Sequence, residues 1–280
     1  MPAIGINDAK IFYQSYGDDH PARTPIVLVH GSTIDGATDW GSVAPALAKE
    51  FRVFTPDCRG HGHSNNPRVT YSFQEMSDDV AAFVRAMGYE RAHIIGHSNG
   101  GNIALVTLME HPEVVQTCIP QAVNAYITRY LVEREPVYFD AARIERDEPE
   151  WMNEMIALHE ETNGKDYWRD LVWLTMVETM SEPNYTPAEL RCVDRPVLVV
   201  MGANDGSNAR DEHAQYIANN IPGAEMWIPE NTGHNVHKER EREWVEKVLE
   251  FLERKGGRRK DELVRSVPAF LLCVPWCSSW

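Results

Sequence analysis

Short runs of apolar residues alternate along this chain with longer segments in which apolar residues recur at helical spacing. The short runs have the length and continuous apolar character of strands that are covered on both faces. We predict strands at residues 10–16, 25–30, 51–55, 92–95, 114–119, 196–201 and 225–228. We predict helices at residues 40–49, 73–87, 209–219 and 239–252, and between the glycine-rich turn at 96–101 and His111. This alternation indicates an α/β fold, a mostly parallel twisted sheet with helices on both faces.

Residues 121–190 interrupt this alternation. The segment contains helix-like stretches and no convincing buried strand, and it is rich in aromatic residues and methionines. We therefore predict a helical lid, inserted between two parts of one sheet domain formed by residues 1–120 and 191–256. Most aromatic side chains of the lid are expected to pack on one another, and a minority to face the functional site.

Residues 257–280 follow the last predicted helix. The basic residues at 258–260 precede an apolar stretch at 267–276 that contains two prolines and lacks a helical period. We expect a disordered tail, with contact to a membrane surface or a partner as the alternative. Cys273 and Cys277 are expected to be ordinary thiols, because no histidine near them completes a metal site.

The overall charge narrows the classes of partner. The 280 residues carry a net charge of −15, and 43% of them are hydrophobic, which fits an acidic globular protein with a sizeable core. Nucleic acid is excluded as a partner, because its phosphates require a cationic protein face. The chain shows no secretory signal, no membrane span and an odd number of cysteines, so we expect a cytoplasmic protein without a disulfide framework.

The sequence Gly96-His97-Ser98-Asn99-Gly100 carries the strongest chemical signal. It follows an apolar strand and precedes a helix, which is the context of a nucleophile elbow. A serine at the apex of such a turn presents its hydroxyl at the mouth of the sheet. The glycines on either side leave room for the strained turn and for close packing of helix on strand. We therefore predict Ser98 as a nucleophile.

A serine hydroxyl needs a base, and the base needs an orienting carboxylate. His234 lies in the loop between the last strand and the last helix, and Asp205 follows the strand at 196–201. Both stand at carboxyl ends of strands and in the order serine, acid, histidine. We predict Asp205 and His234 as catalytic, over His237, which begins the last helix, and Asp194, which precedes its strand.

The negatively charged oxygen of an acyl-transfer intermediate needs two hydrogen-bond donors. We expect the backbone amides of Asn99 and Ser32 to supply them, with His30 and Gly31 holding the loop that carries Ser32. The segment 57–64 contains several histidines and an arginine, but its spacing matches no trusted zinc pattern, so we interpret it as a structural turn. No metal and no cofactor are expected.

These motifs together resemble the α/β-hydrolase fold family, and within it the lid-bearing serine esterase-like group. The resemblance spans residues 1–255 and rests on His30-Gly31, residues 57–64, residues 96–101, Asp205 and Gly233-His234. The serine nucleophile separates the chain from the haloalkane dehalogenases and epoxide hydrolases of this fold, which form an ester on aspartate. Asn99 stands where many relatives carry an apolar residue, which places a polar side chain near the leaving group. No three-glycine oxyanion motif follows His30.

The sequence therefore predicts a serine hydrolase that cleaves carboxylic esters through an acyl-enzyme. The aromatic lid favours a small-molecule ester with an apolar or aromatic part. The same triad also performs amide or lactone hydrolysis, acyl transfer and carbon–carbon cleavage, and some members of the family are ligand receptors. These remain alternatives, and the oligomeric state is left open.

Overall fold

Eight strands form one sheet in the order β1-β2-β4-β3-β5-β6-β7-β8. In the computed structural model, which describes residues 2–19, 23–206 and 210–256, the six strands from β3 to β8 run parallel. At one edge β2 pairs antiparallel with β4, and β1 pairs antiparallel with β2. The strands are β1 (Ala3–Ile6), β2 (Ala9–Tyr16), β3 (Ile26–Val29), β4 (Val53–Pro56), β5 (Ala92–His97), β6 (Val115–Gln121), β7 (Leu198–Val200) and β8 (Glu225–Trp227).

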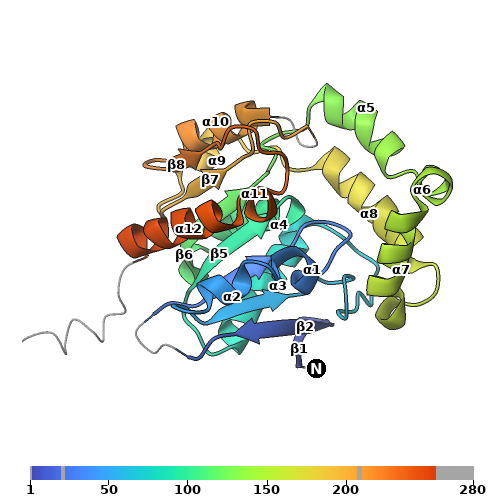
Figure 1. Ribbon diagram of the computed structural model, residues 1–280, viewed down its shortest axis with the longest axis horizontal. Helices are drawn as coiled ribbons and strands as arrows, with labels where there is room; N and C mark the ends of the chain where they lie inside the picture. The colour runs from blue at the N-terminus through green and yellow to red at the C-terminus, as the bar shows by residue number, and fades with distance from the viewer. Residues whose placement is uncertain (1, 20–22, 207–209, 257–280) are drawn as a thin grey trace, which may run out of the picture.

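Helices cover both faces of this sheet (Figure 1). Along β3 the buried side chains alternate between the two faces. Val27 and Val29 join an apolar cluster with α3 and α4, and Ile26 and Leu28 join a second cluster with α2 and α12. The helices that flank the sheet are α1 (Gly36–Trp40), α2 (Ala44–Leu47), α3 (Phe73–Ala86), α4 (Asn99–Glu110), α10 (Arg210–Asn220), α11 (Val236–Glu239) and α12 (Glu241–Lys255), with a 3₁₀ turn at Pro112–Val114. This double covering explains the continuous apolar runs of the parallel strands.

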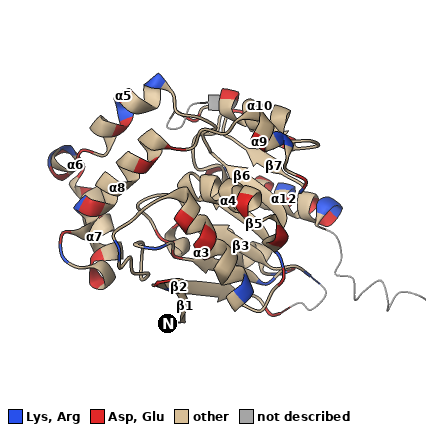
Figure 2. Cartoon of the chain, turned by 180° about the vertical axis from the view of Figure 1, so that it is seen from behind, with Lys and Arg blue, Asp and Glu red and all other residues tan. Residues whose placement is uncertain are grey.

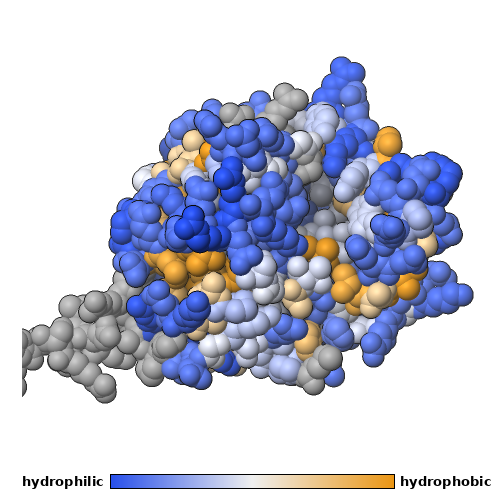
Figure 3. All heavy atoms as spheres, viewed as in Figure 1, coloured by the Kyte–Doolittle hydropathy of each residue, from blue (hydrophilic) through white to orange (hydrophobic). Residues whose placement is uncertain are grey.

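A helical segment, residues 129–191, connects β6 to β7. It consists of α5 (Arg129–Tyr138), α6 (Ala141–Asp147), α7 (Pro149–Asn163), α8 (Tyr167–Ser181) and α9 (Pro187–Arg191). Phe139, Ile144, Met155, Trp168 and Val172 form a third buried cluster within it. Figure 1 shows α5 to α8 as a group beside the sheet. Apolar residues gather between this group and the sheet on the face drawn in Figure 3.

The surface carries acidic residues on many helices. Figure 2 shows them on α3, α7 and α8, with basic residues interspersed among them. Among the described residues, no helix is both long and apolar enough to cross a membrane. Cys58, Cys118 and Cys192 are free thiols. The tail at 257–280, with Cys273 and Cys277, lies outside the described residues.

Several element boundaries differ from the predictions. The helix predicted at 40–49 contains only the short α2, because α1 already ends at Trp40 and Pro45 lies in the first turn of α2. Proline cannot continue a helix from the preceding turn but fits the start of a new one. The helix predicted at 239–252 likewise follows a short α11, with a break at Arg240. Strand β1 was missed because its four residues include a glycine and only Ile6 is buried.

Candidate active site

Ser98 occupies a strained turn between β5 and α4. Its backbone has a φ of 55° and a ψ of −123°, a conformation that costs energy in a residue with a Cβ. Glycines allow the turn to pack tightly. A Cβ at Gly96 would lie 1.9 Å from the Gly100 carbonyl oxygen, and one at Gly100 would lie 2.2 Å from that of Val29. The tight packing of strand against helix fixes the position of Ser98, as the motif requires.

His234 and Asp205 meet across two neighbouring loops. The loops follow β8 and β7 and are joined by the Asn204 amide, which donates to the Thr232 carbonyl oxygen at 2.8 Å. The His234 Nδ1 and Asp205 Oδ2 atoms are 2.8 Å apart. Asp205 is buried, whereas the His234 side chain is 23% exposed. Because Nδ1 faces the carboxylate, Nε2 is the ring nitrogen left to exchange protons.

Ser98 and His234 line the same cavity, which has a volume of about 180 Å³. Gly31, Ser32 and Asn99 also line it. The opposite wall comes from the helical segment and contains Arg134, Glu135, Tyr138, Phe139, Trp151 and Thr179. The structure therefore brings the predicted nucleophile, base and oxyanion donors to one cavity. The predicted minority of aromatic residues from the 121–190 segment faces this site.

The loop after β3 is held by hydrogen bonds. The His30 ring pairs through Nδ1 with the Gly31 carbonyl oxygen at 2.7 Å, and its Nε2 accepts the Cys58 amide at 2.8 Å. The Gly31 amide donates to Asp39 Oδ2 at 3.0 Å. This bond commits the Gly31 amide to Asp39, whereas the next residue, Ser32, lines the cavity.

The side chain of Asn99 has a different environment from the one expected. Its Nδ2 donates to Glu178 Oε2 of α8 at 2.7 Å, and both residues are buried. Burial, together with the nearby Glu182, raises the pKa of Glu178 well above its ordinary value. The Asn99 amide group therefore joins the elbow to a buried carboxyl group of the helical segment, instead of standing free beside a leaving group.

Two polar residues of the cavity wall were not anticipated as site residues. The Arg134 Nη1 and Glu135 Oε1 atoms are 2.5 Å apart, and the Arg134 guanidinium stacks 4.1 Å from the centre of the Tyr138 ring. Burial raises the pKa of Glu135, although Arg134 opposes the shift. No sequence motif surrounds these residues, so only the position of α5 at the cavity could have revealed them.

The residues considered as alternatives to the proposed site residues lie elsewhere or are held by structural hydrogen bonds. His237 is fully buried and hydrogen bonded to Gln121 and Asp39. In the segment 57–64, Arg59 is buried and bonded to Asp79 at 2.6 Å, which agrees with its interpretation as a structural turn. Asp194 is exposed and lies on a different cavity.

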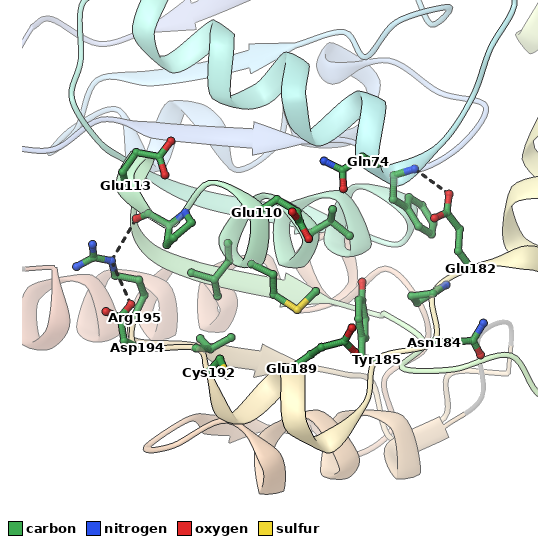
Figure 4. Close-up of a pocket in the computed structure, with 17 residues that line it drawn as sticks. Gln74, Glu110, Glu113, Glu182, Asn184, Tyr185, Glu189, Cys192, Asp194 and Arg195 are labelled. Atoms are coloured by element: carbon green, nitrogen blue, oxygen red, sulfur yellow. Dashed lines mark hydrogen bonds and ion pairs between the residues drawn. The ribbon is translucent and has the colours of Figure 1, made fainter.

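That other cavity is larger, about 630 Å³, and lies between α3, α4 and residues 182–195. Figure 4 shows carboxylates around it, and several of the polar groups it labels are engaged in structural contacts. Arg195 donates to the Pro112 carbonyl oxygen at 3.2 Å, and Glu182 accepts the Phe73 amide at 3.0 Å. None of the predicted catalytic residues lines this cavity, so size alone does not identify the reactive site.

Known sequences provide an independent comparison. The sequence profile of the alpha/beta hydrolase family matches residues 26–248. Serine hydrolase BPHL of Homo sapiens is 25% identical over 245 residues, which cover 84% of this chain and 80% of that protein.

Several solved structures are also similar to this protein. Est816, an N-acyl homoserine lactone degrading enzyme, is 28% identical with a TM-score of 0.71, and the match covers 89% of this chain and all of that one. A thermophilic esterase from Thermogutta terrifontis has a TM-score of 0.73 over 92% of this chain and all of its own. At 19% identity, the second similarity concerns the fold alone.

Proposed function

Because this chain belongs to the alpha/beta hydrolase family, we propose that it is a serine hydrolase that cleaves small carboxylic esters through an acyl-enzyme. One observation carries the proposal. Ser98, on a strained turn, shares a cavity with His234, and Asp205 holds the other side of the His234 ring at 2.8 Å. A nucleophile beside a base that a third group orients is the general signature of covalent catalysis.

In the proposed mechanism, His234 removes the proton of the Ser98 hydroxyl, and the serine oxygen attacks the acyl carbon. Asp205 keeps the ring in the productive tautomer and stabilises its charged form. His234 then protonates the leaving alcohol. It next activates a water molecule, which releases the acid and restores Ser98. These steps need neither a metal ion nor a cofactor.

The proposed oxyanion hole consists of the Ser32 and Asn99 amides. Asn99 stands in the first turn of α4, where amides have no acceptor within the helix and the helix dipole favours negative charge. Ser32 follows the amide that Asp39 has already engaged. His30 and Gly31 support this loop in the proposal. Donors fixed in advance stabilise the charge that develops on the substrate oxygen.

We propose residues 121–190 as a lid that shapes the substrate pocket. Tyr138, Phe139 and Trp151 place aromatic surface opposite Ser98, which favours an ester with an apolar or aromatic part. Lactones are cyclic esters and are a second candidate substrate class, because Est816 degrades such a compound at 28% identity to this chain. The fold itself does not choose between esters, amides and carbon–carbon bonds.

A panel of p-nitrophenyl esters tests the proposal. The wild-type protein should turn over many equivalents of a short-chain ester, and Ser98→Ala should lower kcat by at least about 10³-fold. The matched control is Ser42→Ala, since Ser42 is exposed between α1 and α2. A receptor of the hydrolase type would instead show one slow turnover and lasting modification of His234. Undiminished hydrolysis by Ser98→Ala would refute the proposed nucleophile.

We also propose a cytoplasmic location. The three cysteines of the described residues are free thiols, which fits a reducing compartment.

A further inference from the structure

A second carboxylate lies behind the cavity and is not part of the proposed triad. Asp39, near the end of α1, is fully buried. Its Oδ2 accepts the Gly31 amide at 3.0 Å and lies 3.0 Å from His97 Nδ1. Its Oδ1 lies 3.1 Å from His237 Nε2 and 3.2 Å from the Lys238 ammonium group. One carboxylate thus engages four donors.

The partners of Asp39 lie next to, or within a few residues of, the proposed catalytic groups in the chain. Gly31 precedes Ser32 in the oxyanion loop, and His97 precedes Ser98 at the elbow. His237 lies in the short helix α11, three residues after His234. The His97 ring also packs against the His234 ring, with centroids 4.9 Å apart. A shift of Asp39 would therefore reach the nucleophile, the base and one oxyanion donor together.

The hydrogen positions around Asp39 agree with a carboxylate that accepts hydrogen bonds from His97 and His237. His237 Nδ1 pairs with the Gln121 amide group at 2.7 Å, so Nε2 carries the proton that faces Asp39. Burial lowers the pKa of His97 to about 4, although Asp39 beside it opposes the shift. Burial opposes ionisation of Asp39, yet its bonds to His97 and His237 hold its pKa well below the ordinary value.

Asp39, His97 and His237 also lie close enough together to bind a metal ion. A metal ligand must present a lone pair, whereas the His237 nitrogen that faces Asp39 presents a proton. The Lys238 ammonium group at 3.2 Å would also repel a cation. These hydrogen-bond donors therefore stabilise the buried carboxylate of Asp39 and do not form a metal site.

We propose that Asp39 is a positioning residue that holds the oxyanion loop, the nucleophile elbow and the His234 loop in register for catalysis. The inference rests on the proposed serine hydrolase function and deepens it. Groups that must act together within a fraction of an ångström lose rate steeply when their supports move. Substrate contacts in the cavity come from other residues, so the effect should fall on the chemical step.

Asp39→Asn tests this directly. An asparagine keeps the shape but turns one acceptor into a donor, which then faces another donor whichever way the amide points. We expect kcat to fall about 100-fold while KM changes by less than about threefold. Labelling of Ser98 by a fluorophosphonate should slow by a similar factor. Unchanged kcat in the folded variant would overturn the positioning role.

Asp79→Asn is the matched control. Asp79 is also a buried carboxylate with several hydrogen bonds, but its partners are Arg59 and Asn7, far in sequence from the catalytic loops. This variant should lower the melting temperature and leave kcat within about twofold of the wild type. If Asp79→Asn lost as much kcat as Asp39→Asn, general destabilisation would explain both effects, and the proposal would be overturned.

His237 offers a second route if Asp39→Asn fails to fold. His237→Leu removes one bond to Asp39 and should lower kcat about tenfold. His237→Gln can accept from Gln121 and donate to Asp39, so it should recover most of the rate. Equal rates in both variants would overturn the proposal. Absence of Ser98 labelling in the wild type would refute the serine hydrolase function as well, whereas equal labelling in wild type and Asp39→Asn refutes positioning alone.

Discussion

His159 shows how one buried side chain joins distant parts of the chain. It lies on α7 and is fully buried, yet both ring nitrogens have partners. Nδ1 accepts the Gly62 amide at 2.8 Å, and Nε2 pairs with the Thr33 carbonyl oxygen at 3.0 Å. The helical segment is thereby bonded to the loop that follows β3. Burial lowers the pKa of His159 to about 4, so the ring is neutral at physiological pH.

This histidine should make stability depend on pH. An unfolded histidine has a pKa near 6.5, so between about pH 6.5 and 4 the unfolded chain binds a proton that the folded protein excludes. Stability contributed here is present at neutral pH and is lost as the pH falls through that window. His159→Gln keeps an acceptor and a donor but does not titrate. When the pH is lowered from 7 to 5, the free energy of unfolding should decrease in both proteins. The decrease should be about 2 kcal/mol smaller in His159→Gln than in the wild type.

Urea denaturation at both pH values provides the measurement. Asn163→Ala is the control, because Asn163 joins the same helix to Ser64 at 3.1 Å without a titrating group. That variant should keep the pH dependence of the wild type. Identical pH dependence in wild type and His159→Gln would contradict the lowered pKa of the buried His159.

The sequence could locate the residues that we propose as catalytic, because their positions follow from the local pattern of strands. Ser98, Asp205 and His234 each follow a strand, so a one-dimensional pattern indicates the edge of the sheet where they lie. Asp39 and Glu178 could not be predicted in the same way. Apart from Gly31, their partners lie tens of residues away, and nothing in their immediate neighbours distinguishes a buried hub from an ordinary helix residue.

At the scale of elements, the packing of β5, the elbow and α4 depends on glycines, which have no side chain. A Cβ at Gly100 would lie 2.2 Å from the Val29 carbonyl oxygen and 2.4 Å from that of His30. Both contacts are with backbone, which cannot move aside as a flexible side chain can. The close approach of α4 to β3 therefore requires glycine at this position.

Gly100→Ala should destabilise the fold. We expect a loss of about 3 kcal/mol, which for a domain of this size lowers the melting temperature by roughly 5–10 °C. Gly5→Ala is the matched control, because a Cβ there meets nothing within 4 Å. Circular dichroism melts of the two variants provide the comparison. A melting temperature of Gly100→Ala equal to that of the wild type would contradict the tight packing.

Element type was easier to predict than element boundaries. The parallel strands carry their own signal, because helices on both faces demand continuous apolar residues. The break between α1 and α2 is set by Gly41 and by Pro45, whose effects depend on where a helix begins. The pattern of apolar spacing alone runs across both residues, so the predicted helix began at Trp40, the last residue of α1, and α1 itself was missed.

At the scale of the whole molecule, the candidate site lies between the sheet domain and the helical segment. The cavity of about 180 Å³ is smaller than the roughly 300–1,000 Å³ of pockets that hold drug-sized ligands. We therefore expect kcat/KM to be highest for acetyl to butyryl esters and at least about tenfold lower for decanoyl esters.

The wall of the helical segment offers the control for this prediction. Trp151 lines the cavity, so Trp151→Ala should enlarge it and shift the preference toward longer acyl chains. Steady-state kinetics on a homologous p-nitrophenyl ester series measures both effects. A wild-type preference for decanoyl esters would show that the cavity opens further than the structure indicates.

Active-site labelling tests the central claim most directly. A fluorophosphonate reacts with a serine only when a base activates it and donors receive the developing charge. Peptide mapping by mass spectrometry should find one adduct, on Ser98, with no adduct in Ser98→Ala and a rate at least about 100-fold lower in His234→Ala. An adduct on a different residue, or an unchanged rate without His234, would contradict the account.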